Sequence, residues 1–170
     1  MKNLIFSLLI LLGTSLTFAQ NLKLNLQKAE VGFYFRGDKV NGSLSGLTAD
    51  IQINLLDLTK TKVKGSVDVT TIKTGISMRD KHLISSDFFD AKAHPKMTFV
   101  SKEIEVKDDV LYIDGLLTIK ATTRKERFEL RIKDGEIVFT GQINTADYDV
   151  MTKKNRDKTE VDITITIPSA

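Results

Sequence analysis

The sequence predicts an all-β domain of antiparallel strands with one helical insertion. Apolar side chains recur at every second position along most of the chain, and short turn signals separate these runs. Only the stretch over residues 72–94 departs from the alternation for long enough to hold a helix. Each strand therefore has one apolar and one polar face, and the apolar faces must be covered.

The predicted strands follow one another in chain order. The first has Val31, Phe33 and Phe35 on one face, with Gly32 and Tyr34 on the other. Later runs repeat this arrangement, which gives about eight or nine strands in all. Their apolar positions are Ile51, Ile53 and Leu55; Val63, Val67 and Val69; Met97 and Phe99; Leu111 and Ile113; Leu117 and Ile119; Phe128, Leu130 and Ile132; Ile137, Phe139 and Ile143; and Val161, Ile163, Ile165 and Ile167.

Turn signals lie between these runs. They are Arg36–Asp38, Asn41–Gly42, Asp108–Asp109, Asp134–Gly135 and the polar run Thr152–Thr159. Gly, Asn and Asp accept a positive φ at little cost, so these segments suit hairpin connections between consecutive antiparallel strands. No long linker or internal repeat divides the chain, and we therefore expect one domain.

The N-terminal residues have the layout of a secretory signal peptide. Lys2 precedes an apolar run over Leu4–Leu12, and small or polar residues lead to Ala19. The run is too short to span a bilayer as a stable helix. We expect cleavage of residues 1–19, which leaves a single domain over residues 20–170 in the periplasm or secreted. The sequence has no cysteine, so a lipoprotein anchor has no attachment atom, and disulfides and thiol chemistry are excluded.

Composition is that of an ordinary globular protein. Hydrophobic residues make up 41% and charged residues 28% of the 170 residues, which indicates neither disorder nor a multispan membrane protein. The formal net charge of +3 includes Lys2. A mature chain of about +2 is too weakly charged for a surface that follows phosphates, so we expect no nucleic-acid partner.

Candidate catalytic and metal-binding residues are few. His82 and His94 are the only histidines, and their spacing matches no metal-binding motif. Asp80, Asp87 and Asp90 lack the spacing of an EF-hand calcium loop. Structural hydrogen bonds explain these side chains more simply, so we expect no metal, no cofactor and no catalytic site.

Asp147 and Asp149 flank Tyr148 and offer a further acid and base. On a strand, residues two apart share one face, and here we expect it to be the polar face. A hydrolase or isomerase acting on a bound lipid would depend on Asp147, Asp149 or His82, provided that one of them opens into the interior.

Residues 79–101 carry the most specific pattern of the chain. They read R-D-K-H-L-I-S-S-D-F-F-D-A-K-A-H-P-K-M-T-F-V-S. This run resembles the pattern R-D-x-H-L-x-S-x-D-F-F-D, followed by P-x-[MI]-x-F-x-S, of the YceI-like family, small secreted β-barrels that bind polyisoprenoids. The likeness extends more loosely from about Leu24 to Ile167. The matching residues are Arg79, Asp80, His82, Leu83, Ser85, Asp87, Phe88, Phe89, Asp90, Pro95, Met97, Phe99 and Ser101.

The resemblance decides an architecture that the alternation leaves open. A sheet with one apolar face closes into a barrel or folds into a sandwich, and periodicity does not distinguish them. The family's fold implies an extended antiparallel, eight-stranded, lipocalin-like β-barrel, with a short helical insertion at about residues 77–92 near its mouth.

The chain departs from the family pattern in three segments. These are Lys28–Phe33, which lacks the usual His and Ser; Gly115–Arg124, which has Lys120 and Ala121 for His and Gly; and Ile143–Asp149, which lacks an Arg and a Gly. These changes spare the apolar framework and alter polar positions, so they affect recognition of the ligand's polar end more than the fold.

The barrel interior is the candidate binding site. A long branched hydrocarbon needs a dry cavity with an aliphatic and phenyl wall, and each buried methylene contributes about 0.8 kcal/mol. The expected ligand is a polyisoprenoid, prenyl diphosphate or quinone. The predicted wall residues are Phe33, Phe35, Ile53, Val67, Val69, Phe88, Phe89, Met97, Phe99, Leu117, Phe128, Ile137 and Phe139.

Cations near the mouth are candidates for the polar end of the ligand. Basic segments such as Arg124–Arg127 are commonly solvated loop charge. Alternatively, Lys120, Arg124 and Lys153 hold a diphosphate headgroup or meet an anionic membrane surface.

Two non-enzymatic functions follow. The first is transport, storage or sequestration of an isoprenoid-type lipid in the cell envelope, with transient membrane contact and a homodimer as further expectations. The alternative is an envelope-stress or structural protein whose filled barrel binds a protein partner. Periodicity does not distinguish a cavity wall from a filled core.

Overall fold

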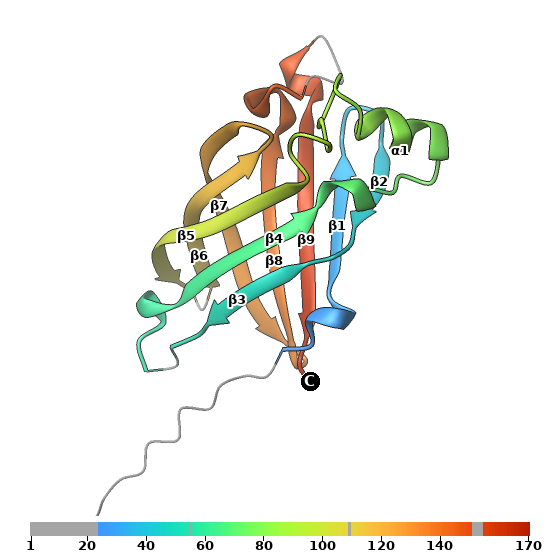
Figure 1. Cartoon of the computed structure of the whole chain (residues 1–170). Helices are drawn as coiled ribbons and strands as arrows, with labels where there is room; N and C mark the ends of the chain where they lie inside the picture. Colours follow the sequence, from blue (N-terminus) through green and yellow to red (C-terminus); the bar gives the residue numbers. More distant parts are fainter. Residues whose placement is uncertain (1–23, 55, 109, 151–154) are drawn as a thin grey trace, which may run out of the picture.

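The computed structural model describes residues 24–54, 56–108, 110–150 and 155–170. The predicted signal peptide and Lys153 lie outside these residues. The described chain forms one curled antiparallel sheet with a single α-helix at one end (Figure 1). None of its described helices is long and apolar enough to cross a membrane.

The described residues form nine strands, one more than the eight that the family resemblance implied. The strands are β1 (Glu30–Phe35), β2 (Val40–Leu44), β3 (Thr48–Gln52), β4 (Lys62–Asp68), β5 (Lys96–Lys107), β6 (Val110–Ile119), β7 (Thr122–Lys133), β8 (Glu136–Asn144) and β9 (Glu160–Pro168). The helix is α1 (Ser77–Leu83), and the short 3-10 helices are η1 (Leu26–Lys28), η2 (Leu58–Lys60), η3 (Val69–Thr71), η4 (Thr145–Tyr148) and η5 (Arg156–Lys158).

The sheet order explains how the interior is enclosed. It runs β2-β1-β9-β8-β7-β6-β5-β4-β3, so the edge strands β2 and β3 are consecutive in sequence. The segment after η3 covers part of the seam between them. Ser43 and Lys73 exchange backbone hydrogen bonds of 2.8 and 2.9 Å, and the amide of Asp68 donates to the carbonyl of Ser45 at 3.4 Å. The predicted antiparallel all-β class is confirmed, as a curled sheet with a seam.

Two hairpins differ from the prediction. Asn41 and Gly42 form no turn, because Gly42 pairs with Phe33 inside β2. The turn between β1 and β2 covers residues 36–39, as the signal at Arg36–Asp38 predicted, and Lys39 has a φ of 55°. The runs at Leu111–Ile113 and Leu117–Ile119 belong to one strand, β6, and the next turn begins at Lys120 with a φ of 53°. A lysine carries no turn signal, which is why this hairpin escaped prediction.

The helical insertion is shorter than the predicted residues 77–92. After α1 ends at Leu83, the chain continues in turns. The Phe89 amide donates to the carbonyl of Leu83 at 3.0 Å, and the Ala91 amide to that of Ile84 at 3.0 Å. Phe89 and Ala91 are buried. Burying this segment against the sheet therefore replaces continuation of the helix.

Candidate functional site

A cavity of about 320 Å³ lies inside the curled sheet. All nine strands contribute to its wall, together with Phe88 and Phe89 from the segment after α1. The volume falls at the lower end of the range of about 300–1,000 Å³ typical of small-molecule sites. Most wall side chains are aliphatic or phenyl, and such a wall suits a hydrocarbon ligand.

Glycines explain why the phenylalanines leave this space open. A Cβ on Gly42 would lie 2.1 Å from Cζ of Phe33, and one on Gly115 would lie 2.3 Å from Cζ of Phe99. Each ring thus occupies the place of a missing side chain on another strand and lies against the sheet. The pairs are Phe33 with Gly42, Phe99 with Gly115, and Phe128 with Gly141.

Ten of the thirteen predicted wall residues border the cavity. They are Phe33, Phe35, Val67, Phe88, Phe89, Met97, Phe99, Leu117, Phe128 and Phe139. The other three, Ile53, Val69 and Ile137, do not. Val69 and Ile137 are buried within the two core clusters, and Ile53 lies past the end of β3 and packs on the second cluster. Ligand contact by the ten remains a prediction.

Several wall residues escaped the prediction. Ile51, Val63 and Ile163 belong to predicted strands and border the cavity. Their place in the same alternation was the signal that could have found them. Val40 and Leu44 also border the cavity. Because Asn41–Gly42 between them was predicted as a turn, neither residue was assigned to the inner face of a strand.

Polar groups border the cavity beside α1. The Arg79 guanidinium donates from Nε to Oγ1 of Thr74 at 2.7 Å and from Nη2 to the carbonyl of Thr74 at 2.6 Å. The amide and hydroxyl of Thr74 donate to Oδ1 of Asp80 at 2.8 and 2.5 Å. Thr74 and Arg79 border the cavity, whereas Asp80 is buried behind them. Asp80 thus fixes Thr74, and Thr74 orients Arg79.

His82 lies one helical turn further on. Its Nε2 is 3.6 Å from Oδ2 of Asp87. Its ring meets that of Phe88 edge-on, with 4.7 Å between the ring centroids. Both rings border the cavity, as does Asp38 from the β1–β2 turn. The α1 end of the cavity therefore combines polar groups with an aromatic wall.

The predicted headgroup cations lie elsewhere. Lys120 donates from Nζ to the carbonyl of Asp149 at 3.2 Å, and Arg124 from Nε to the carbonyl of Asp147 at 3.1 Å. Neither side chain borders the cavity, and Lys153 lies outside the described residues. Because they bind backbone carbonyls at η4, Lys120 and Arg124 anchor that element to the sheet.

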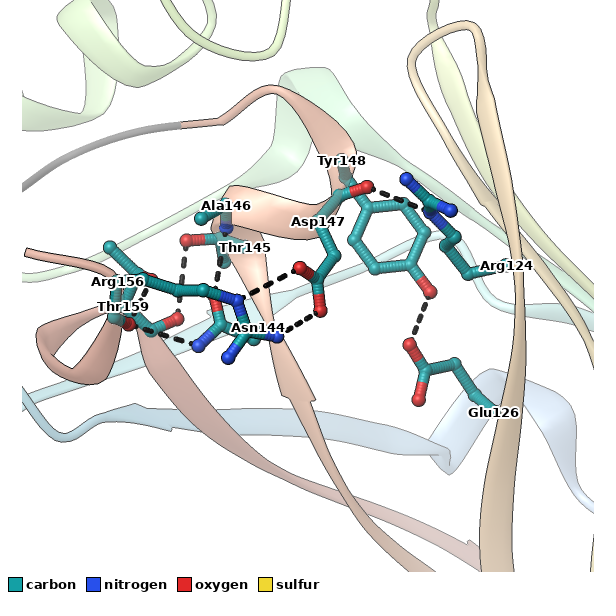
Figure 2. Close-up of polar contacts among 9 residues, drawn as sticks. All are labelled: Arg124, Glu126, Asn144, Thr145, Ala146, Asp147, Tyr148, Arg156 and Thr159. Atoms are coloured by element: carbon teal, nitrogen blue, oxygen red, sulfur yellow. Dashed lines mark hydrogen bonds and ion pairs between the residues drawn. The ribbon is translucent and has the colours of Figure 1, made fainter.

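Asp147 and Asp149 occupy η4 and its C-terminal cap, not a strand as expected. Asp147 accepts hydrogen bonds from Nε and Nη2 of Arg156 at 3.1 and 2.6 Å (Figure 2). Asp149 has a φ of 57° and accepts from the Thr122 hydroxyl at 3.2 Å. Neither carboxylate borders the cavity. The two aspartates therefore do not meet the requirement for acid-base chemistry on a bound lipid, whereas His82, the third residue named for that chemistry, borders the cavity.

Between these aspartates, Tyr148 is fully buried. Its hydroxyl donates to Oε1 of Glu126 at 2.6 Å (Figure 2). Burial raises the pKa of the Glu126 carboxyl, and the hydrogen bond from Tyr148 partly offsets this effect. Burial also raises the pKa of the Tyr148 phenol, and the adjacent Glu126 adds to the increase. The pair joins η4 to β7.

Comparison with known proteins places this architecture in a family. The model of the YceI-like domain matches residues 22–168. The chain belongs to the YceI-like family. Among curated relatives, a UPF0312 protein of Staphylococcus epidermidis is 36% identical over 92 residues, which are 54% of this chain and 52% of that protein. This YceI-like chain thus spans about half the length of that relative.

Two solved structures share the fold of this YceI-like domain. BcnA of Burkholderia cenocepacia has a TM-score of 0.74 at 21% identity, over 87% of this chain and all of BcnA. A polyisoprenoid binding domain from Saccharophagus degradans, implicated in plant cell wall breakdown, has a TM-score of 0.60 at 13% identity, over 86% of this chain and 97% of that domain.

The YceI-like pattern over residues 79–101 forms one end of the cavity. Arg79, His82, Phe88, Met97 and Phe99 from that pattern all border it. The pattern thus contributes both the polar groups beside α1 and part of the apolar wall. Thr74, which orients the arginine, precedes the pattern and could not be assigned from it.

Proposed function

We propose that the protein binds an isoprenoid-type lipid or a similar long-chain amphiphile in its cavity, without chemical change, and so carries, stores or sequesters it in the cell envelope. The supporting observation is the apolar cavity of about 320 Å³ to which all nine strands contribute. The name of the Saccharophagus domain, a polyisoprenoid binding domain of the same fold, agrees with this function.

Burial of the hydrocarbon tail supplies the affinity. Each buried methylene contributes about 0.8 kcal/mol, so a prenyl tail needs few polar contacts. Because the cavity is small for its class, we expect part of a long chain to extend through the opening. An open interior also favours this function over a filled barrel that serves only to bind a protein partner.

We assign the polar end of the ligand to Arg79 instead of Lys120 or Arg124. No ion pair between described residues involves Arg79. Thr74 takes two of its N–H groups, and a guanidinium has five. Its remaining donors and full charge suit an anionic group such as a phosphate, because charge-assisted hydrogen bonds are strong.

The test compares an uncharged prenol with the prenyl phosphate of the same chain length, by equilibrium titration. The native protein is expected to bind both saturably and the phosphate more tightly. Arg79→Gln should remove about tenfold of the affinity for the phosphate while sparing the prenol. Arg124→Gln is the matched control and should change neither affinity.

The two parts of the proposal fail separately. If neither ligand saturates the native protein, the lipid-binding function is wrong. If Arg79→Gln retains the native preference for the phosphate, only the assignment of the polar end is wrong. Equal losses for both ligands, with a lower Tm, would mean that Arg79 merely supports the fold through Thr74.

A further inference from the structure

Two exposed apolar side chains stand at the start of α1. Ile76 is 54% exposed and Met78 is 82% exposed. Ile72 and Thr74 precede them as buried residues. The helix projects beyond the edge of the sheet near β1 and β2 (Figure 1). Ile76 and Met78 therefore lie on a protruding part of the molecule.

Local helix stability does not account for Ile76. It occupies the N-cap position of α1 and makes no side-chain capping hydrogen bond. Ser, Thr, Asp or Asn at this position would satisfy one of the free amides of the first turn, and Ile is among the poorest caps. An exposed isoleucine that weakens its own helix points to a role outside the fold.

The exposed charged side chains of residues 73–81 are all positive. Lys73 and Lys81 are exposed on either side of the two apolar residues. The one carboxylate between residues 73 and 81 is that of Asp80, which is buried and accepts two hydrogen bonds from Thr74. The nearest following carboxylate, that of Asp87, lies 3.6 Å from His82.

We propose that Lys73, Ile76, Met78 and Lys81, here called the α1 surface, dock the protein on an anionic phospholipid bilayer. Exposed apolar side chains flanked by lysines match the interfacial zone, where apolar groups enter the acyl boundary and cations meet lipid phosphates. Arg79, His82 and Leu83 of the same helix border the cavity. Docking through the α1 surface thus brings the cavity's polar end to the membrane.

This inference extends the proposed function, but its test needs no cavity ligand. The native protein is mixed with vesicles of phosphatidylcholine alone, or of phosphatidylcholine with an equal amount of phosphatidylglycerol, and sedimented. We expect binding to the mixed vesicles that weakens with added salt. The double variant Ile76→Ser, Met78→Gln should bind at least about fivefold more weakly.

The variants are chosen so that folding does not confuse the result. Serine is a favoured N-cap residue, and glutamine has a helix propensity close to that of methionine. The matched control is Leu56→Gln, since Leu56 is 90% exposed but belongs to the β3–β4 connection at the other end of the sheet (Figure 1). It should bind vesicles as the native protein does.

Three outcomes would overturn the α1 surface as a docking site. They are no binding of the native protein to mixed vesicles, undiminished binding of the double variant, or an equal loss in Leu56→Gln. Prenol titration in solution separates this inference from the proposed function, because the double variant should keep the native affinity there. If the native protein binds the prenol but does not sediment with vesicles, only the docking inference is wrong.

Discussion

Glu126 is a half-buried carboxylate on β7 that accepts a hydrogen bond from fully buried Tyr148. Burial raises the pKa of Glu126 above its ordinary value. A raised pKa in the folded state contributes stability that is complete below the unfolded pKa of about 4.3 and is lost as pH rises through the folded pKa.

Glu126→Gln is therefore expected to stabilise the protein at pH 7. Glutamine keeps an acceptor for the Tyr148 hydroxyl without placing a charge in a partly dry site. Thermal unfolding should show a Tm a few degrees above the native value at pH 7, and the difference should shrink toward pH 4. A lower Tm at pH 7 would mean that the charged hydrogen bond to Tyr148 outweighs the cost of burial.

Roles of single residues were the hardest part to predict from sequence. The family pattern includes Arg79 and His82. It does not include Thr74, so it could not show that Thr74 holds the Arg79 guanidinium through two hydrogen bonds. Lys120 and Arg124, not Arg79, were predicted as headgroup cations. Their binding to η4 carbonyls depends on how a separate segment folds back, and local pattern does not contain that information.

At the scale of elements, the β1–β2 hairpin contributes Phe33, Val40 and Leu44 to the cavity wall. The ring of Phe33 lies where a side chain at Gly42 would be, and the three atoms nearest to the vacant Cβ position all belong to that ring. The ring is the far end of a flexible side chain, so a methyl group at Gly42 would displace it without moving the backbone. The ring would then turn into the cavity.

Gly42→Ala is expected to weaken prenol binding by about tenfold, because overpacking costs about 1–3 kcal/mol and the displaced ring takes ligand space. Asn41→Ala is the matched control on the same strand, because Asn41 is exposed and does not border the cavity. Its affinity for the prenol should equal that of the native protein. Native affinity in Gly42→Ala would show that Phe33 does not bound the ligand site.

The sequence predicted those strands whose position follows from apolar alternation alone. Alternation identified β1, β9 and the first half of β5, where apolar side chains of one face pack inward. Beyond the register shift between Ser101 and Glu103, β5 is mostly exposed. Alternation failed for β2, where Gly42 accommodates a ring and resembles a turn residue. The helical insertion was predicted and is present as α1, but the helix ends at Leu83, earlier than predicted, and Phe89 beyond it is buried.

At the scale of the whole molecule, sequence predicted the sheet, and the family resemblance implied a ligand cavity inside it, but neither predicted the seam or how the interior stays open. Because the sheet curls, its two edge strands, β2 and β3, approach each other. Backbone pairing of Ser43 with Lys73 covers part of the gap between them. The interior is open because three glycines on separate strands accept phenyl rings. Both features arise from pairs distant in sequence, which periodicity within one strand does not report.

Lipid carriage is the central claim, and the cargo of the native protein tests it most directly. The full chain is expressed in bacteria, purified without detergent, and extracted with organic solvent for mass spectrometry. We predict one molecule of an unmodified prenyl lipid, quinone or similar long-chain amphiphile for each protein molecule. Protein that is reproducibly empty, and that takes up no added prenyl lipid, would contradict the account.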